Sequence, residues 1–317
     1  MTTTVKKLDP LDVCEGSYGS IPIKHDKDKD VHAEEHRLDS GTVLKLAKFP
    51  SLTDFVNQTD RMTDGKMAKT NNWAMGSRSM TLSKTRSNLL QGCAPNDKVV
   101  DSYKERRKQL DAVLSQVKES RMIRSARRKR VKGWAGGNVN VQRYLNSVQN
   151  NSPAPCFDLM TKRHQTPIIK LGINHVLSCG NSQEDFGRLV ASATAVAELL
   201  TVKGYGVQVD AVGITHSAPG GKEQQALIYP IKRADEPVNP GKFLSLSHTG
   251  LTRNYWFRAR ASFFGYLSGE GNARDTTEDV VKYLGYDMLI GKTWAHDYQC
   301  ETILSDVVNI LDSAKNK

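Results

Sequence analysis

Twelve basic and three acidic side chains lie between residues 103 and 132, so this stretch alone has a net charge of +9. The whole chain of 317 residues carries +11, and residues 1–102 and 133–317 add only +1 each. A local cluster of one sign predicts a polyanionic partner, most often a nucleic acid, because Lys and Arg neutralise phosphates. We expect the phosphate contacts from the second half of this cluster and two nearby cations: Arg121, Arg124, Arg127, Arg128, Lys129, Arg130 and Lys132, helped by Lys84 and Arg86.

A single long helix over residues 101–132 is predicted to position these cations. The stretch is rich in helix formers, has no Gly or Pro, and stops at Gly133. Its apolar stripe, continued at the same helical spacing, meets arginines, so a core face becomes a basic face halfway along. The alternative is a solvated helix face or a flexible basic tail. The internal position and the nearly unmixed sign of the charge argue against that alternative.

Aromatic side chains near cations suggest base stacking as a second kind of contact, because single-stranded nucleic acid needs charge for phosphate and a ring for the base. Trp73 and Trp134 lie in polar surroundings before and after the basic stretch. A helix predicted over residues 251–267 places Arg253, Trp256 and Arg260 on one side, at spacings of three and four. Each of these sites has an alternative interpretation without nucleic acid. Trp73 could anchor the core, and residues 251–267 could form a core helix with arginines on its surface.

The first 40 residues are expected to be flexible, because residues 24–30 alternate in charge and have little to bury. The sequence His32-Ala-Glu-Glu-His36 has a zinc-protease spacing, but its charge-rich flanks favour a polar loop over a metal site. A Ser, Asn and Pro-rich linker over Ser147–Pro155 marks the best internal boundary. We therefore predict three regions: a flexible charged N-terminus (1–40), an N-terminal region with the basic helix (41–150) and an α/β domain (151–317).

The C-terminal part alternates strand and helix. Strands are predicted over residues 168–174, 207–214 and 226–232, with a helix over 184–200 that makes the first two strands parallel. An edge strand over 286–290 and a closing helix over 302–311 complete the pattern. The predicted fold class is α/β, a twisted, largely parallel sheet flanked by helices, either von Willebrand A-like or novel. At the position where that fold holds a magnesium motif, Asn174 and Val176 replace metal-binding residues, so we expect no such site.

Motifs for enzymatic chemistry are missing from the sequence. It contains no GxGxxG, no GxxxxGK[ST], no GxSxG and no kinase set, so we expect no cofactor and no catalytic residues. A hydrolase would need a serine and a histidine held together by a third group. The sequence offers Ser217, His216 and His248 but no such arrangement, so we interpret them as ordinary polar residues. There is no apolar run of about 18 residues and no signal peptide, and the five scattered cysteines indicate reduced thiols. We therefore expect an intracellular protein outside the membrane.

The order of these segments resembles a family of phage-encoded proteins. The resemblance rests on Trp73-Ala-Met-Gly76, the basic stretch, residues 136–145, Pro155-Cys-Phe-Asp158, the strand at 168–174, Lys203-Gly-Tyr-Gly206 and residues 251–260, and it spans roughly residues 70–312. The chain is similar to the single-stranded-DNA-binding RNA polymerase cofactor of podophages that carry their own heterodimeric RNA polymerase. This resemblance implies an early, non-enzymatic phage protein in the cytoplasm of the infected bacterial cell. It would grip unwound promoter DNA and recruit the phage RNA polymerase.

Two other classes of function stay open at this point. One is a von Willebrand A-like protein-interaction scaffold whose basic helix docks on an acidic protein. The other is a binder of double-stranded DNA or of RNA, since phosphate attraction is common to all nucleic acids. The sequence leaves the oligomeric state open, including a homo-oligomer.

Overall fold

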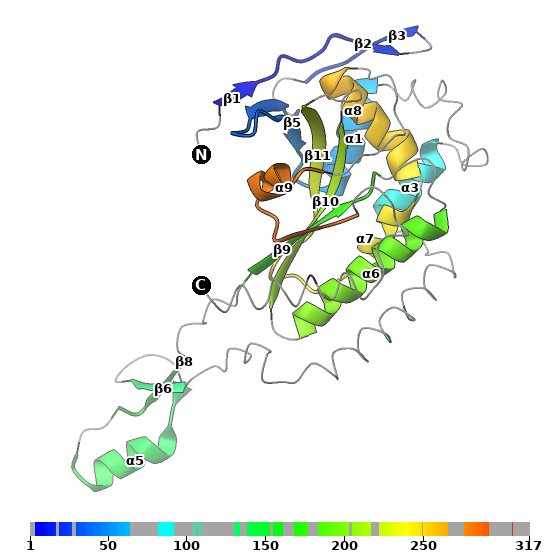
Figure 1. The fold of residues 1–317 in the computed structure, drawn as a ribbon. Coiled ribbons are helices and arrows are strands. Elements are labelled where there is room, and N and C mark those ends of the chain that lie inside the picture. Colours follow the sequence, from blue (N-terminus) through cyan, green and yellow to red (C-terminus); the bar gives the residue numbers. More distant parts are fainter. Residues whose placement is uncertain are drawn as a thin grey trace.

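A computed structural model of the chain describes residues 4–16, 19–26, 30–63, 82–91, 104, 108, 130–133, 138–152, 155–160, 168–176, 183–202, 205–216, 222–248, 250–265, 276–291 and 306. A seven-stranded sheet lies at its centre (Figure 1). In spatial order the strands are β1 (Thr4–Lys7), β4 (Glu34–Arg37), β5 (Val43–Lys48), β11 (Glu223–Lys232), β10 (Gly206–His216), β9 (Ile168–Asn174) and β12 (Met288–Ile290).

The strand directions make this a mixed sheet. The pairs β5–β11, β10–β9 and β9–β12 are parallel. The pairs β1–β4, β4–β5 and β10–β11 are antiparallel. From β5 to β12, parallel pairs therefore dominate, and helices flank the sheet. This confirms the predicted α/β class.

The unit β9–α6–β10 follows the alternation of strand and helix in the sequence. Helix α6 (Gln183–Val202) connects the parallel strands β9 and β10, whose register pairs Gly206 with Ile168 and Val212 with Asn174. The short strand β12 lies at the sheet edge, as predicted for residues 286–290. The closing helix predicted over 302–311 lies outside the described residues, apart from residue 306, which is helical.

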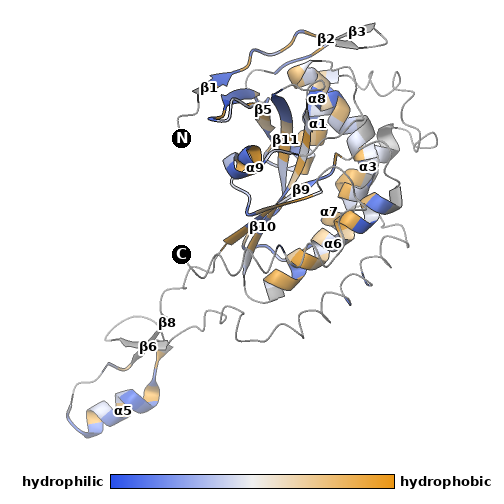
Figure 2. Ribbon diagram, in the orientation of Figure 1, coloured by the Kyte–Doolittle hydropathy of each residue, from blue (hydrophilic) through white to orange (hydrophobic). Residues whose placement is uncertain are grey.

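Most of the helices cover one face of the sheet (Figure 1). These are α1 (Leu52–Thr63), α3 (Leu82–Gln91), α6, α7 (Pro240–Leu244), the π-helix η3 (Leu251–Trp256) and α8 (Phe257–Phe264), with the 3-10 turn η2 (Ser245–Ser247) between α7 and η3. The larger apolar core lies here, with Leu171, Val209 and Tyr229 from the strands packed against α6, α1 and η3. Figure 2 shows the apolar residues that line α6 and the inner strands.

Helix α9 (Glu278–Leu284) packs on the opposite face of the sheet. A smaller core there contains Leu44, Leu46 and Ile214 from the strands and Val280 from α9. Two polar contacts tie α9 to β4 and to the turn that follows it: the Tyr283 hydroxyl lies 2.6 Å from His36 Nδ1, and Ser40 Oγ donates to Asp279 Oδ2. The C-terminal half of the chain thus packs directly on strands from its first 40 residues.

The prediction of a flexible N-terminus is wrong for the residues that the structure describes. Strands β1 and β4 belong to the central sheet, and β2 (Val13–Gly16) pairs with β3 (Gly19–Pro22) as a separate hairpin. His36 lies in β4, so the HAEEH sequence forms neither the helix that a zinc site would need nor a polar loop. The sequence did not reveal β1 and β4 because both are short and rich in charged residues, as the outer part of a sheet tolerates.

The predicted boundary between residues 41–150 and 151–317 is also absent from the central sheet. Strand β5 pairs with β11 in parallel, from Val43 opposite Glu223 to Lys48 opposite Ile228. One sheet therefore contains strands from both predicted regions. Backbone pairing between segments far apart in sequence leaves no local compositional signal that would reveal it.

Candidate nucleic-acid interface

The basic stretch ends in a strand. Residues Arg130–Gly133 form β6, which pairs antiparallel with β8 (Phe157–Met160). The predicted helix over 101–132 is therefore wrong at its C-terminal end, where pairing with β8 overrides the helix propensity of Arg and Lys and suits β-branched Val131. Earlier in the stretch the structure describes two residues, Lys104 and Lys108, and both are helical and exposed.

Most of the predicted phosphate contacts fall outside the described residues. These are Arg121, Arg124, Arg127, Arg128 and Lys129, together with the stacking candidates Trp73 and Trp134. For Lys84 in α3, Arg253 in η3, and Arg130 and Lys132 in β6, the structure describes the backbone and not the side chain. The candidates with described side chains are Arg86, Trp256 and Arg260.

Arg130 and Lys132 lie at alternate positions of β6, opposite Met160 and Asp158 of β8. Successive residues of a strand face opposite sides of the sheet, so this register places both basic positions on one face. Asp158 also pairs with Asn138 of the third strand, β7 (Asn138–Val139). The last part of the basic stretch is thereby held on a three-stranded sheet.

A short helix, α5 (Val141–Gln149), lies between β7 and β8. Asn140 caps its N-terminus, since the Asn140 Oδ1 accepts a hydrogen bond from the Arg143 N–H at 3.1 Å. The Arg143 guanidinium donates to the Pro155 carbonyl at 3.0 Å, and the Ser147 hydroxyl donates to the Ser152 carbonyl at 2.8 Å. We refer to β6, β7, α5 and β8 together as the small unit (Figure 1).

These contacts correct the prediction of a linker over residues 147–155. Ser152 and Pro155 are bonded back to α5, and the Asn140 N–H donates to the Cys156 carbonyl at 2.7 Å. Strands β7 and β8 pair across the segment. The described residues of this range, which include the end of α5 at Gln149, are therefore bonded within the small unit and do not form a free linker.

Trp256 and Arg260 are buried in the core, which corrects their assignment as nucleic-acid contacts. Trp256 has no exposed surface and Arg260 is 1% exposed. The Arg260 Nε donates to Gln225 Oε1 at 2.8 Å, and its guanidinium lies 5.9 Å from the Trp256 ring centre. Trp256 packs so closely on the β10 backbone that a Cβ at Gly213 would overlap its indole nitrogen. In this conformation neither side chain can reach a base or phosphate.

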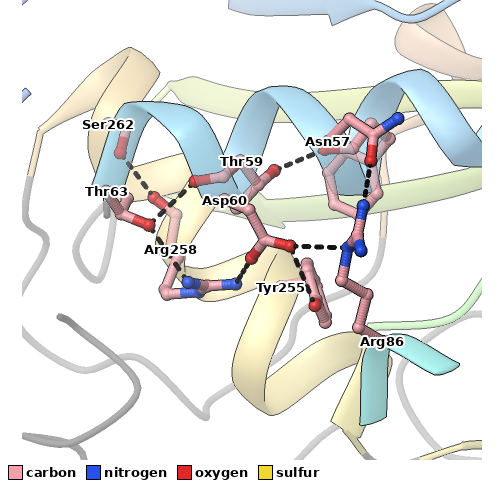
Figure 3. A network of polar contacts seen from close by, with 9 residues as sticks. Asn57, Thr59, Asp60, Thr63, Arg86, Tyr255, Arg258 and Ser262 are labelled. Carbon is pink, nitrogen blue, oxygen red and sulfur yellow. Dashed lines mark hydrogen bonds and ion pairs between the residues drawn. The ribbon is translucent and has the colours of Figure 1, made fainter. Parts of the chain in front are cut away.

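Arg86 takes part in an ion-pair network around Asp60 (Figure 3). Its Nε lies 3.2 Å from Asp60 Oδ2, and its Nη2 donates to Asn57 Oδ1 at 2.6 Å. On the other side, Arg258 donates from Nη2 to Asp60 Oδ1 at 2.8 Å and from Nη1 to Thr63 Oγ1 at 3.0 Å. This network joins α1, α3 and α8, so Arg86 serves the fold in addition to any phosphate contact.

Tyr255 completes the Asp60 network. Its hydroxyl donates to Asp60 Oδ2 at 3.3 Å, and the Arg258 guanidinium lies 4.8 Å from its ring centre. Burial, together with the charge of Asp60, raises the pKa of Tyr255 far above its ordinary value. The hydroxyl is therefore a permanent donor, and the network holds one carboxylate between two guanidinium groups.

A buried histidine follows strand β9 at the position where a von Willebrand A-like fold would bind metal. Burial lowers the pKa of His175 to about 3, so the ring is neutral, and it lies 3.2 Å from the Tyr229 hydroxyl. The Asn174 Oδ1 accepts from the N–H groups of Val176 and Ile214. These contacts give both residues structural roles, and among the described residues no group of three His, Cys, Asp or Glu side chains could hold a metal ion.

The structure adds one feature that the predicted site lacked, the apolar face of α5. Val141, Tyr144, Leu145 and Val148 are 47–63% exposed, and no residue of this helix is buried. Figure 2 shows that apolar positions alternate with polar ones along α5. The spacing of three, four and seven residues is readable in the sequence, but spacing alone normally indicates a face that packs on the protein itself.

The fold and the candidate interface define a mixed α/β protein with a seven-stranded sheet and with the small unit, which contains the end of the basic stretch. Within this class, the chain belongs to the family described as Domain of unknown function (DUF7192), whose model matches residues 29–304. That range contains both the basic stretch and the small unit. No curated protein and no solved structure matches the chain. None of the described helices is long and apolar enough to cross a membrane.

Proposed function

We propose that this protein is a non-enzymatic single-stranded-DNA-binding protein that acts in phage transcription. The carrying observation is the net charge of +9 within residues 103–132, in a chain whose remainder is nearly neutral. A cluster of this size provides the sequence-independent attraction to phosphates on which most nucleic-acid affinity depends. The role in transcription, with recruitment of the phage RNA polymerase, is supported by the resemblance of residues 70–312 to the podophage cofactor.

The folded body supports the same assignment, because many of its described cations are already paired. Arg258 and Arg86 bind Asp60, Lys45 lies 3.0 Å from Glu223, and Arg61 pairs with Asp30. Lys232 is buried and donates to two backbone carbonyls. The excess positive charge of the chain therefore comes from the basic stretch, whose last residues are anchored in β6.

Salt dependence is the first test of this proposal. If about six phosphates are contacted on a single strand, the slope of log affinity against log salt concentration should be roughly −4. Fluorescence anisotropy with labelled oligo(dT) at several salt concentrations measures that slope. A slope near zero would contradict the proposal. Duplex DNA and RNA, measured at one salt concentration, separate single-strand binding from the duplex-DNA or RNA alternative, which predicts equal or tighter binding to those ligands.

A substitution series locates the contact. Replacement of Arg121, Arg124, Arg127 and Arg128 with alanine should abolish binding to oligo(dT), while the circular dichroism spectrum and melting temperature stay unchanged. The design spares Arg130 and Lys132 because they lie in β6. A matched control removes four exposed cations from the body, Lys48, Lys222, Lys242 and Lys282, and should retain most of the affinity. Equal losses in both variants would place the interface elsewhere.

A further inference from the structure

The apolar face of α5 has the geometry of a docking surface. Val141, Tyr144, Leu145 and Val148 recur at positions that share one side of a helix. They are 63%, 52%, 47% and 60% exposed, and Val139 just before the helix is 50% exposed. A contiguous group of exposed apolar side chains on a short helix marks a contact site rather than ordinary surface.

The helix is held in shape before any partner binds. An isolated nine-residue helix is marginal in water, and here it buries none of its own residues. The Asn140 cap and the two side-chain bonds to the 152–155 loop fix its ends instead. A partner therefore pays little ordering entropy when it binds this face.

The charge of α5 indicates what kind of partner fits. Arg143 is its one charged residue, and its guanidinium is already bonded to the Pro155 carbonyl. The other polar residues of the helix are uncharged Gln, Asn and Ser. A face with an apolar centre and an uncharged rim offers no counter-charge to an acidic or a basic partner, but it is complementary to itself across a two-fold axis.

We infer that α5 contacts α5 of a second copy of this chain when two copies occupy the same single strand, which turns back between them because a two-fold contact reverses the direction of the second copy. This inference rests on the proposed function. Four half-exposed side chains fall well short of the roughly 800 Å² per partner of a standard interface. The contact is thus weak in free solution and becomes effective where DNA raises the local concentration of a neighbouring copy. Binding to long strands should then be cooperative.

The test compares strand lengths with a charge-bearing variant. The double substitution Tyr144→Asp and Leu145→Asp places like charges opposite each other in the contact. On a long oligo(dT) it should reduce the Hill coefficient to one and weaken apparent affinity by about tenfold. On a short oligo(dT) that holds one copy, affinity should equal that of a matched control, Gln142→Asp with Asn146→Asp, which adds the same charge on the polar side of α5.

Charge exchange identifies the second copy as the occupant. A variant with Tyr144→Lys and Leu145→Lys, mixed with the Asp variant, should restore cooperativity that neither variant has alone. Sedimentation equilibrium at high protein concentration, without DNA, should show the same pattern of self-association. The inference is overturned if the Asp variant binds long strands as cooperatively as its control does. It is also overturned if the Asp variant, and not its control, loses binding to the short strand. Absence of binding to any strand would refute the proposed function instead, and sedimentation alone would then decide the α5 contact.

Discussion

Removal of the Asp60 carboxylate should be far more damaging than removal of its exposed partner. The Arg258 side chain is fully buried, and Asp60 carries the negative charge that compensates it, with 24% of its own side chain exposed. The substitution Asp60→Asn keeps the shape of the side chain but leaves a buried cation uncompensated. Loss of one partner from such a pair costs about 3–5 kcal/mol. For a chain of this size, that corresponds to a fall of roughly 6–20 °C in melting temperature.

The matched control is Arg86→Ala, which removes the other guanidinium from the same carboxylate. The Arg86 side chain is 48% exposed, so water and salt screen its ion pair. Pairs of this kind contribute about 0.2–1 kcal/mol. Replacement of both members of the Asp60–Arg258 pair, Asp60→Leu with Arg258→Met, should recover much of the stability lost in Asp60→Asn, because the buried charge of Arg258 is removed as well.

Urea denaturation followed by tryptophan fluorescence measures these free energies of unfolding for all the variants. We expect a large loss for Asp60→Asn, a small one for Arg86→Ala and an intermediate value for the double variant. Burial of Arg258 would not determine the loss of stability if Asp60→Asn lowered the free energy of unfolding by less than about 1 kcal/mol. Equal losses for Asp60→Asn and Arg86→Ala would refute the reasoning as well.

Two further predictions concern the core around β9 and β10. His175 is neutral in the fold with a pKa of about 3, against an ordinary value of 6.5, so the unfolded chain binds the extra proton as pH falls between these values. Because of this residue, the free energy of unfolding should fall by up to about 1.4 kcal/mol per pH unit below pH 6.5. In urea titrations at several pH values, His175→Gln should lose this part of the pH dependence. An identical pH dependence in both proteins would contradict a neutral, buried His175. Gly213→Ala should cost about 1–3 kcal/mol, because the new Cβ overlaps the buried Trp256 indole, and an unchanged melting temperature would show that the core relaxes around it.

The strand–helix–strand unit could be predicted from the sequence because its signals are local. Residues 168–174 and 207–214 are mostly apolar, and an alanine-rich helix lies between them, as expected for strands with helices packed on the sheet. The Ser51–Asp54 spacing likewise indicates the start of α1, where the Ser51 hydroxyl accepts from the Asp54 N–H at 3.1 Å. In each case the elements are specified by residues that are close together in the chain.

Other parts of the structure depend on residues far apart in the chain. Arg258 reads as a surface cation in sequence because its counter-charge, Asp60, lies 198 residues away. The sequence leaves the burial of Trp256 and Arg260 open for the same reason, and the π-helix over Leu251–Trp256 changes the angular step on which their helical spacing relies. The charged strand β4 was missed because its pattern resembles a solvated loop, although β5 and β1 pair with it on both sides.

The pairing of β5 with β11 also sets an order of events during synthesis. When β5 leaves the ribosome, about 180 residues remain to be made before β11 emerges, which takes roughly 10–40 s at ordinary translation rates. Until then, one edge of β5 has no neighbouring strand, and its apolar residues Leu44 and Leu46 lack most of their core. A nascent chain halted within that interval should be sensitive to proteases and to chaperone binding, and it should become resistant only after β11 has been released.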